Sequence, residues 1–219
     1  MLAIKHRIGG RKLLCVIKAN GYGHGAVQIA KSIENIENVQ FAVFSFEEAL
    51  ELRDANIQND ILVFSRIQSQ YIKLAHENNI TLNISAIEDI DEINSYFSLN
   101  GACPRYHLKF DTGMTRLGFD LKDASLIYSK INKNIVTYLE GVYTHFATAD
   151  EGNLSYAISQ LNNFKKVIEM ADEYGIKFKN IHCSNSGAII NIKDSYFNMV
   201  RARMLLYGAL PSNEVKDNI

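Results

Sequence analysis

Short apolar runs rich in β-branched and aromatic residues alternate with amphipathic helical segments along most of this 219-residue chain. Strict alternation of strands and helices predicts a parallel sheet with right-handed crossovers. About eight such units at this length favour an α/β fold, a closed (β/α)8 TIM-type barrel, over an open doubly wound sheet. The predicted strands are Leu13–Ile17, Phe41–Phe44, Ile61–Phe64, Thr81–Ile84, Tyr106–Phe110, Leu139–Thr144, Ile181–Cys183 and Asn198–Val200.

The longest helical segment, Leu154–Tyr174, repeats apolar residues at spacings near three and four, as an amphipathic helix does. No low-complexity linker, charge block or internal repeat marks a boundary, so we expect a single domain over residues 1–219. The other predicted helices are Ala26–Ile33, Phe46–Asp54, Ser69–Glu77, Ile87–Phe97, Asp120–Ile131 and Ala188–Ile192.

Composition narrows the class of protein. A hydrophobic content of 47% and a charged content of 21% are those of an ordinary soluble globular protein. A formal net charge of −1 argues against nucleic-acid or membrane-surface partners, and no apolar run approaches the roughly 20 residues that span a bilayer. The basic N-terminus lacks the apolar core of a secretory signal. Cys15, Cys103 and Cys183 are widely spaced and odd in number, which favours reduced thiols in a cytoplasm and no metal site.

The segment Val16–Gly25 combines a lysine at a strand exit with a glycine-rich turn. Desolvation at such an exit lowers the pKa of Lys18, as a Schiff-base lysine requires. Gly21 and Gly23 allow the backbone to approach a ligand closely, and their amides, with that of Gly25, are candidates to hold an anion. The alternative is that Lys18 only carries charge into solvent.

Further candidates follow the later strands, where a barrel of this kind collects its functional groups. Arg116, in a glycine-flanked loop, offers a planar fork for a carboxylate or a phenolic oxygen. His145 follows the sixth strand. Asn185 and Ser186 open a short helix whose backbone amides suit a phosphate. Each has an ordinary structural alternative: a surface arginine, a core histidine and, for Ser186, a plain N-cap.

Five segments resemble, in the same order, motifs of the alanine racemase family, which uses pyridoxal 5'-phosphate (PLP) to interconvert amino-acid enantiomers. They are Val16–Gly25, Lys109–Gly118, Tyr143–Asp150, His182–Gly187 and Asn198–Gly208. The resemblance runs from the first predicted strand to the last. It implies PLP as cofactor, a small amino acid as substrate, alanine before others, and a role in D-alanine supply for the cell wall.

The resemblance also implies roles for residues near the reacting atoms. Lys18 would hold the cofactor covalently and act as one of two bases, and Tyr22 would bind its phosphate. Arg116 would contact the substrate carboxylate and the cofactor's ring oxygen. The family's counterpart of Lys109 can be carbamylated and holds that arginine in place. His145 would lie beside the cofactor and orient a tyrosine base donated by a partner subunit.

The remaining implied roles concern the two ends of the cofactor. Ser186 would bind the phosphate, with Asn185 beside it and the backbone amide of Met204 contributing. Arg201 would donate to the pyridine nitrogen, and because an arginine keeps its proton, that nitrogen would stay unprotonated. A weaker electron sink of this kind favours plain racemisation over side reactions.

Two residues depart from the family pattern. Thr115 stands where glycine is usual, a mild departure in a loop. Arg203 stands where the family has a glycine whose amide meets the phosphate. Arg203 either crowds the phosphate, at extra cost if its φ is positive, or adds a favourable charge.

Family members also have an N-terminal segment and a β-rich C-terminal domain, and we recognise neither in this sequence. Racemisation needs a base on each face of the α-carbon, and Lys18 supplies one. The family's second base is a tyrosine from the partner's C-terminal domain in a homodimer, so the dimer is in question here. The sequence therefore predicts a cytoplasmic alanine-racemase-type enzyme or its barrel portion, with a catalytically silent PLP-binding barrel as the alternative.

Overall fold

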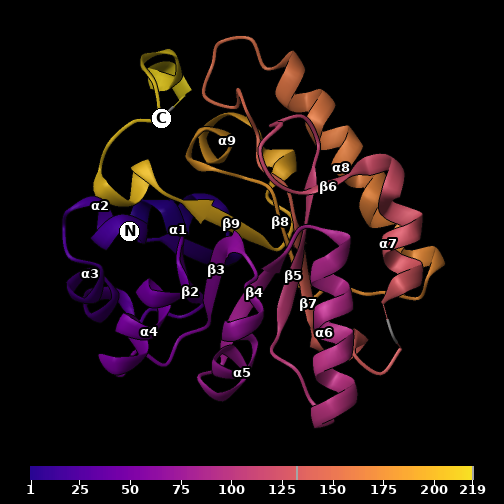
Figure 1. Ribbon diagram of the computed structural model, residues 1–219. Helices are drawn as coiled ribbons and strands as arrows, with labels where there is room; N and C mark the ends of the chain where they lie inside the picture. Colours follow the sequence, from indigo (N-terminus) through magenta and orange to yellow (C-terminus); the bar gives the residue numbers. More distant parts are fainter. Residues whose placement is uncertain (132, 219) are drawn as a thin grey trace.

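Eight parallel strands form a nearly closed barrel in the computed structural model, which describes residues 1–131 and 133–218 (Figure 1). The strands pair in the order β8-β7-β5-β4-β3-β2-β1-β9. Between the two ends of this path, the amide of Arg201 donates to the carbonyl of Ser184 at 2.9 Å. The predicted (β/α)8 fold is confirmed. The strands are β1 (Lys12–Val16), β2 (Val39–Val43), β3 (Ile61–Arg66), β4 (Ile80–Ile84), β5 (Tyr106–Asp111), β7 (Leu139–Tyr143), β8 (Asn180–His182) and β9 (Met199–Ala202).

Helices follow most strands and cover the outside of the barrel, and all the predicted helices are present with small shifts at their ends. The largest shift is at Asp120–Ile131, where a two-residue strand, β6 (Phe119–Asp120), and a 3-10 turn precede the helix. The Asp120 carboxylate accepts from the Lys122 amide at 3.1 Å and holds this turn. Apart from the short turn α2 (Lys18–Tyr22), the helices after β1 are α3 (Ala26–Ile33), α4 (Phe46–Asp54), α5 (Ser69–Glu77), α6 (Ile87–Asn100), α7 (Ala124–Lys130), α8 (Ser155–Glu173) and α9 (Ser186–Asn191).

A further helix, α1 (Leu2–Ile8), precedes the first strand and has no counterpart among the predicted elements. Its buried residues, Ile4 and Ile8, join the main apolar core. Arg7 donates from Nε and Nη2 to the carbonyls of Ile189 and Ile190 at 2.9 and 2.6 Å. These carbonyls belong to α9, so α1 completes the helical layer beside the last two strands.

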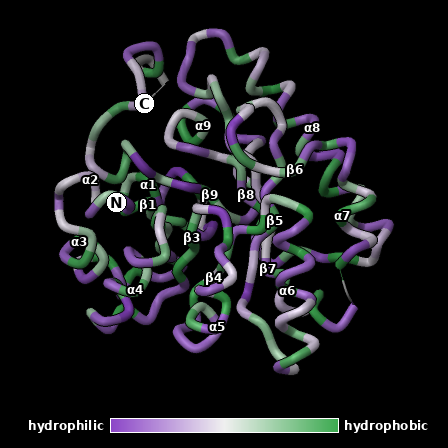
Figure 2. The backbone as a smooth tube through the Cα atoms, in the orientation of Figure 1, coloured by the Kyte–Doolittle hydropathy of each residue, from purple (hydrophilic) through white to green (hydrophobic). Residues whose placement is uncertain are grey.

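The buried residues form two apolar clusters and a set of buried polar side chains. The main core lies between strands and helices, and most helices bury an apolar face against it, whereas five of the six residues of α9 are buried. Hydrophobic and hydrophilic residues are interspersed along the helices in Figure 2. A second, smaller cluster includes Leu14, Val16 and Leu62. By contrast, His107 and Lys109 alternate along β5 and are buried, although they are polar.

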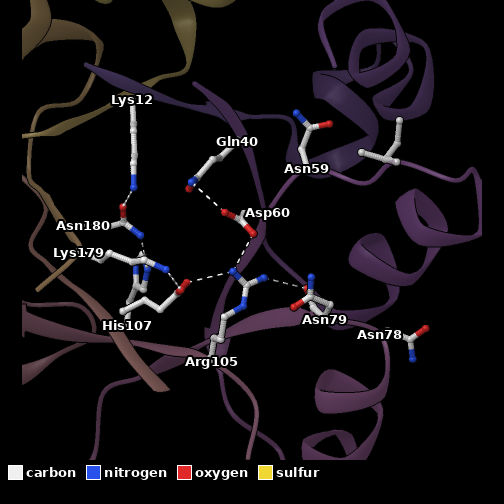
Figure 3. Close-up of polar contacts among 12 residues, drawn as sticks. Lys12, Gln40, Asn59, Asp60, Asn78, Asn79, Arg105, His107, Lys179 and Asn180 are labelled. Atoms are coloured by element: carbon white, nitrogen blue, oxygen red, sulfur yellow. Dashed lines mark hydrogen bonds and ion pairs between the residues drawn. The ribbon is translucent and has the colours of Figure 1, made fainter. Parts of the chain in front are cut away.

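Polar side chains close the end of the barrel where the strands begin (Figure 3). The Arg105 guanidinium bridges the carboxylates of Asp60 and Glu140 at 2.7 and 3.1 Å. Lys12 donates to the Asn180 side-chain oxygen at 2.6 Å. These contacts are far along the strands from the predicted site, and they indicate a stabilising role at this end. No helix within the described ranges is long and apolar enough to span a bilayer.

The loop after β5 is built on one carboxylate. Asp111 accepts from the backbone amides of Gly113, Thr115 and Arg116 at 2.9, 3.0 and 2.9 Å. This arrangement places Thr115 at φ 55°, in the left-handed region that a β-branched residue rarely adopts. The departure from glycine at this position is therefore not mild, because it carries backbone strain.

We expect Thr115→Gly to raise the free energy of unfolding by about 1 kcal/mol, because the left-handed strain of roughly 1–2 kcal/mol exceeds the added chain entropy of glycine. Denaturant unfolding measures the change. Thr115→Asn should raise the free energy of unfolding by less than Thr115→Gly, because asparagine tolerates a positive φ better than threonine but less freely than glycine. Thr115→Ala should change it little. A loss of stability in Thr115→Gly would contradict the strain at this position.

Candidate active site

A cavity of about 700 Å³ lies at the carboxyl ends of the barrel strands. Its lining contains every residue that the sequence analysis placed in the site. These residues come from five separate segments of the chain, and the fold brings all of them to one place. They are Lys18, Tyr22, Lys109, Arg116, His145, Asn185, Ser186, Arg201, Arg203 and Met204.

Lys18 begins a left-handed turn, α2 (Lys18–Tyr22), directly after β1. Ala19, Asn20 and Tyr22 have φ of 53°, 51° and 54°, so the strain is not confined to the glycine between them. The half-buried Lys18 side chain lies with its Nζ 5.3 Å from the centre of the Phe44 ring. Burial lowers its pKa, and the nearby Arg203 and Arg116 lower it further.

The glycine amides of this turn do not hold an anion, so that expectation is wrong. The amide of Gly21 donates to the Ile17 carbonyl at 2.8 Å, and that of Gly25 to the Asn20 carbonyl at 2.9 Å. The Gly23 amide is similarly engaged with the Asn20 carbonyl at 3.1 Å. The glycines serve instead to form the left-handed turn.

Glu48 of α4 supports the same turn from outside. One carboxylate oxygen accepts from the Ala19 amide, and the other accepts from the amides of Phe44 and Ser45 at 2.7 and 3.1 Å. The Asn20 side chain accepts from the Ala26 amide at 2.9 Å. These bonds hold the strained backbone beside Lys18.

Arg201, on β9, is buried in the floor of the cavity. Its Nη atoms donate to the carbonyls of Thr144, His182 and Cys183 at 2.8, 3.0 and 3.0 Å. They also contact Nδ1 of His182 at 2.9 Å and Nδ1 of His145 at 3.1 Å. Burial lowers the pKa of Arg201 to about 10, which still leaves it charged at neutral pH. Its Nε–H has no hydrogen-bond partner in the described part of the chain.

The two imidazoles beside Arg201 are held neutral. Burial and then the charge of Arg201 lower the pKa values of His145 and His182 well below their usual range. Because a guanidinium only donates, each imidazole accepts at Nδ1 and carries its proton on Nε2. His145 thus borders the cavity as a neutral imidazole whose single proton is on Nε2.

Sequence analysis missed a buried layer beneath this site. His182 contacts Nδ1 of His107 through its Nε2 at 3.0 Å and stacks on the Tyr143 ring at 4.8 Å. Tyr143 donates its hydroxyl to the Asn83 side chain at 2.8 Å. The sequence signal for this layer was the presence of polar residues within otherwise apolar strands.

Lys109 and Arg116 occupy the wall formed by β5 and its loop. Lys109 is buried and lies with Nζ 5.6 Å from the centre of the Tyr143 ring. Burial, with the charges of Arg116 and Arg201, lowers the pKa of Lys109 to about 8. The exposed Arg116 guanidinium forms no ion pair with the described carboxylates.

At the start of α9, the N-cap is Asn185 and not Ser186. The Asn185 side chain accepts from the Ala188 amide at 3.0 Å. The Ser186 hydroxyl oxygen accepts from the amides of Arg203 and Leu205 at 3.0 and 3.4 Å. Its own O–H therefore remains a donor for another group in the cavity.

The lining of the cavity favours an anionic ligand. Tyr22 has a buried hydroxyl without a hydrogen-bond partner among the described residues. Four cationic side chains of the lining, Lys18, Lys109, Arg116 and Arg203, lack a carboxylate partner in the described chain, and Asp150 is the acidic residue in that lining. An orphaned donor and surplus positive charge fit a bound anion.

Comparison with known proteins identifies the family. The model of the alanine racemase N-terminal domain matches residues 1–211. The alanine racemase of Desulforamulus reducens is 39% identical over 215 residues, covering 97% of this chain and 58% of its own length. The alanine racemase of Methanococcus maripaludis is 39% identical over 206 residues, which cover 93% of this chain and 55% of that protein.

Solved structures agree with these relatives. Alanine racemase from Clostridium difficile 630 superposes with a TM-score of 0.92 at 38% identity, over 99% of this chain and 57% of that one. A histidine racemase from Leuconostoc mesenteroides superposes with a TM-score of 0.85 at 26% identity, over 98% of this chain and 57% of that one. The chain spans a little over half the length of these relatives. It belongs to the alanine racemase N-terminal domain family.

Proposed function

We propose that this chain is the PLP-binding barrel of an amino-acid racemase. The observation that carries the proposal is that every site residue implied by five separate motifs lines one cavity at the carboxyl ends of the strands. Accidental matches would have no reason to converge there. The relatives named above as alanine racemases favour alanine as the substrate.

When bound, PLP withdraws electrons from the α-carbon of an amino acid and makes its hydrogen acidic. Lys18 would hold the group and move the α-proton, a role that its lowered pKa supports. Arg201 would meet the ring nitrogen with its free Nε–H, while its Nη atoms remain bound to the barrel. Because Arg201 stays charged, it would donate a hydrogen bond there without transferring a proton.

Arg116 is the candidate for the substrate carboxylate. Its guanidinium is exposed at the cavity and offers a bidentate fork for a planar anion. Lys109 lies below, and a carbamate on its amine would add a negative charge to hold Arg116. The histidine racemase among the similar structures shows that this fold also occurs in an enzyme named for a larger substrate.

The base for the opposite face has no candidate among the tyrosines of the described lining, Tyr22 and Tyr143. Tyr143 donates its hydroxyl to Asn83, and burial raises its pKa. Burial likewise raises the pKa of Tyr22, against the opposing charge of Arg203. We therefore propose that the second base comes from outside the residues described here, as a tyrosine of a partner subunit in a homodimer.

The assignment of Lys18 predicts a covalent link to the cofactor. Purified protein with PLP should show a visible absorption band that borohydride bleaches, and the label should then remain on the tryptic peptide containing Lys18. Lys109→Met is the matched control and should keep the reducible band. Retention of the same band by Lys18→Ala would refute the assignment.

The pKa of about 8 at Lys109 predicts a pH-dependent carbamate. The free amine attacks CO₂, forms the N–C bond and releases a proton, so occupancy should rise as pH increases through about 8 and fall below it. Carbon NMR with labelled bicarbonate measures it. Arg116→Ala should move the midpoint upward, because removing a cation raises the pKa of Lys109. A signal that persists in Lys109→Gln would disprove the assignment.

With one base only, the 219-residue chain should racemise alanine at least about a hundredfold more slowly than a complete two-domain enzyme. Exchange of the α-hydrogen with solvent deuterium should survive better, because the lysine face suffices for it. NMR in deuterated buffer follows both reactions. Racemisation by residues 1–219 at the rate of a complete enzyme would show that a side chain of this chain supplies the second base.

A further inference from the structure

Arg203 does not adopt the left-handed backbone that would make a residue other than glycine costly at its position. Its φ is −120°, outside the left-handed region. Its side chain is exposed at the cavity, so the arginine has room where the family has glycine. The structure thus removes the main physical argument that this residue obstructs the site.

The backbone amide of Arg203 is engaged within the protein. It donates to the Ser186 hydroxyl oxygen at 3.0 Å, which the Leu205 amide also approaches at 3.4 Å. An amide used in this way does not serve an anion directly. It instead polarises the Ser186 hydroxyl, whose hydrogen is left to donate into the cavity.

The guanidinium of Arg203 is placed by an aromatic platform. Its central carbon lies 5.0 Å from the centre of the Tyr22 ring, within the range of a cation–π contact. Tyr22 packs edge-on against Tyr207 at 5.5 Å, and the Tyr207 hydroxyl donates to the Val16 carbonyl at 3.2 Å. The platform is therefore fixed to the end of β1, with the unpartnered Tyr22 hydroxyl at its edge.

We propose that the Arg203 guanidinium completes the phosphate site already implied for Tyr22 and Ser186, and that it supplies the charge that selects a phosphate dianion. The inference rests on the proposed function and deepens it. A phosphate monoester is mostly a dianion at pH 7, since its second pKa is near 6. Tyr22 and Ser186 are neutral donors, so Arg203 provides the full positive charge among the three.

Arg203 also acts on Lys18. After burial, its charge is the largest cause that lowers the Lys18 pKa. Removing the charge should therefore raise this pKa and leave less free amine at neutral pH. This effect needs no phosphate, so it provides a second, independent readout.

The test is titration of the apoprotein with PLP and with unphosphorylated pyridoxal, followed by absorbance. With both affinities measured above the Lys18 pKa, Arg203→Met, which is neutral and of similar reach, should bind PLP about tenfold more weakly, while its pyridoxal affinity stays unchanged. Arg203→Lys should recover part of the loss, and high salt should narrow the difference. Arg66→Met is the matched control, because Arg66 lines the same cavity but is paired with Glu88 and Asp89.

Two further measurements separate the possible failures. The pH profile of the rate of pyridoxal addition to Lys18 should shift to higher pH in Arg203→Met. Inorganic phosphate alone should protect the Arg203 peptide from arginine-directed labelling. If the wild type binds phosphate through Arg203 but not PLP, the proposed function fails and the phosphate site stands. If Arg203→Met and Arg203→Gly bind PLP as tightly as the wild type, or more tightly, the phosphate site is refuted while the proposed function survives.

Discussion

The buried guanidinium of Arg201 is the constraint on which the site depends. A full charge inside a barrel is costly unless hydrogen bonds satisfy it, and here three backbone carbonyls and two imidazole nitrogens accept from the Nη atoms, which leaves the Nε–H as the free donor within the described chain. Because the guanidinium has no acceptor, it fixes the proton positions of His182 and His145. The ionisation of the cavity floor thus follows from one residue at the end of β9.

The effect of Arg201 on proton positions extends from the cavity toward the end of the barrel where the strands begin. His182, with its proton on Nε2, donates to Nδ1 of His107, which then carries its own proton on Nε2 toward Asn180 at 3.5 Å. Asn180 is held from below by Lys12. Two cations, Lys12 and Arg201, therefore donate inward from opposite ends of the barrel, each into its own hydrogen-bonded series. The two series meet at Nδ2 of Asn180 and Nε2 of His107, which are both donors in this arrangement, so their 3.5 Å contact is not a hydrogen bond.

The strands and most helices could be predicted because the spacing of apolar residues and the length of each run are local properties of the sequence. The candidate site residues came from the family resemblance together with their places at strand ends, and the fold brings them to one cavity. It missed α1, a seven-residue helix whose stability comes from burying Ile4 and Ile8 against the finished barrel. It misjudged the glycine amides, because Ala19 and Tyr22 gave no sign of a left-handed turn. The buried layer formed by His107 and His182 could not be predicted without knowing which face of each strand points into the barrel.

The cations of the cavity are costly to the protein without a ligand. The charges of Arg203 and Arg116 lower the pKa of Lys18, those of Arg116 and Arg201 lower the pKa of Lys109, and the turn beside Lys18 is strained as well. Such charges destabilise the folded state through mutual repulsion. An anion that binds only the folded state relieves this repulsion and shifts the folding equilibrium by mass action. The repulsion that costs the folded protein stability is therefore what the phosphate and the substrate carboxylate of the proposed function would relieve.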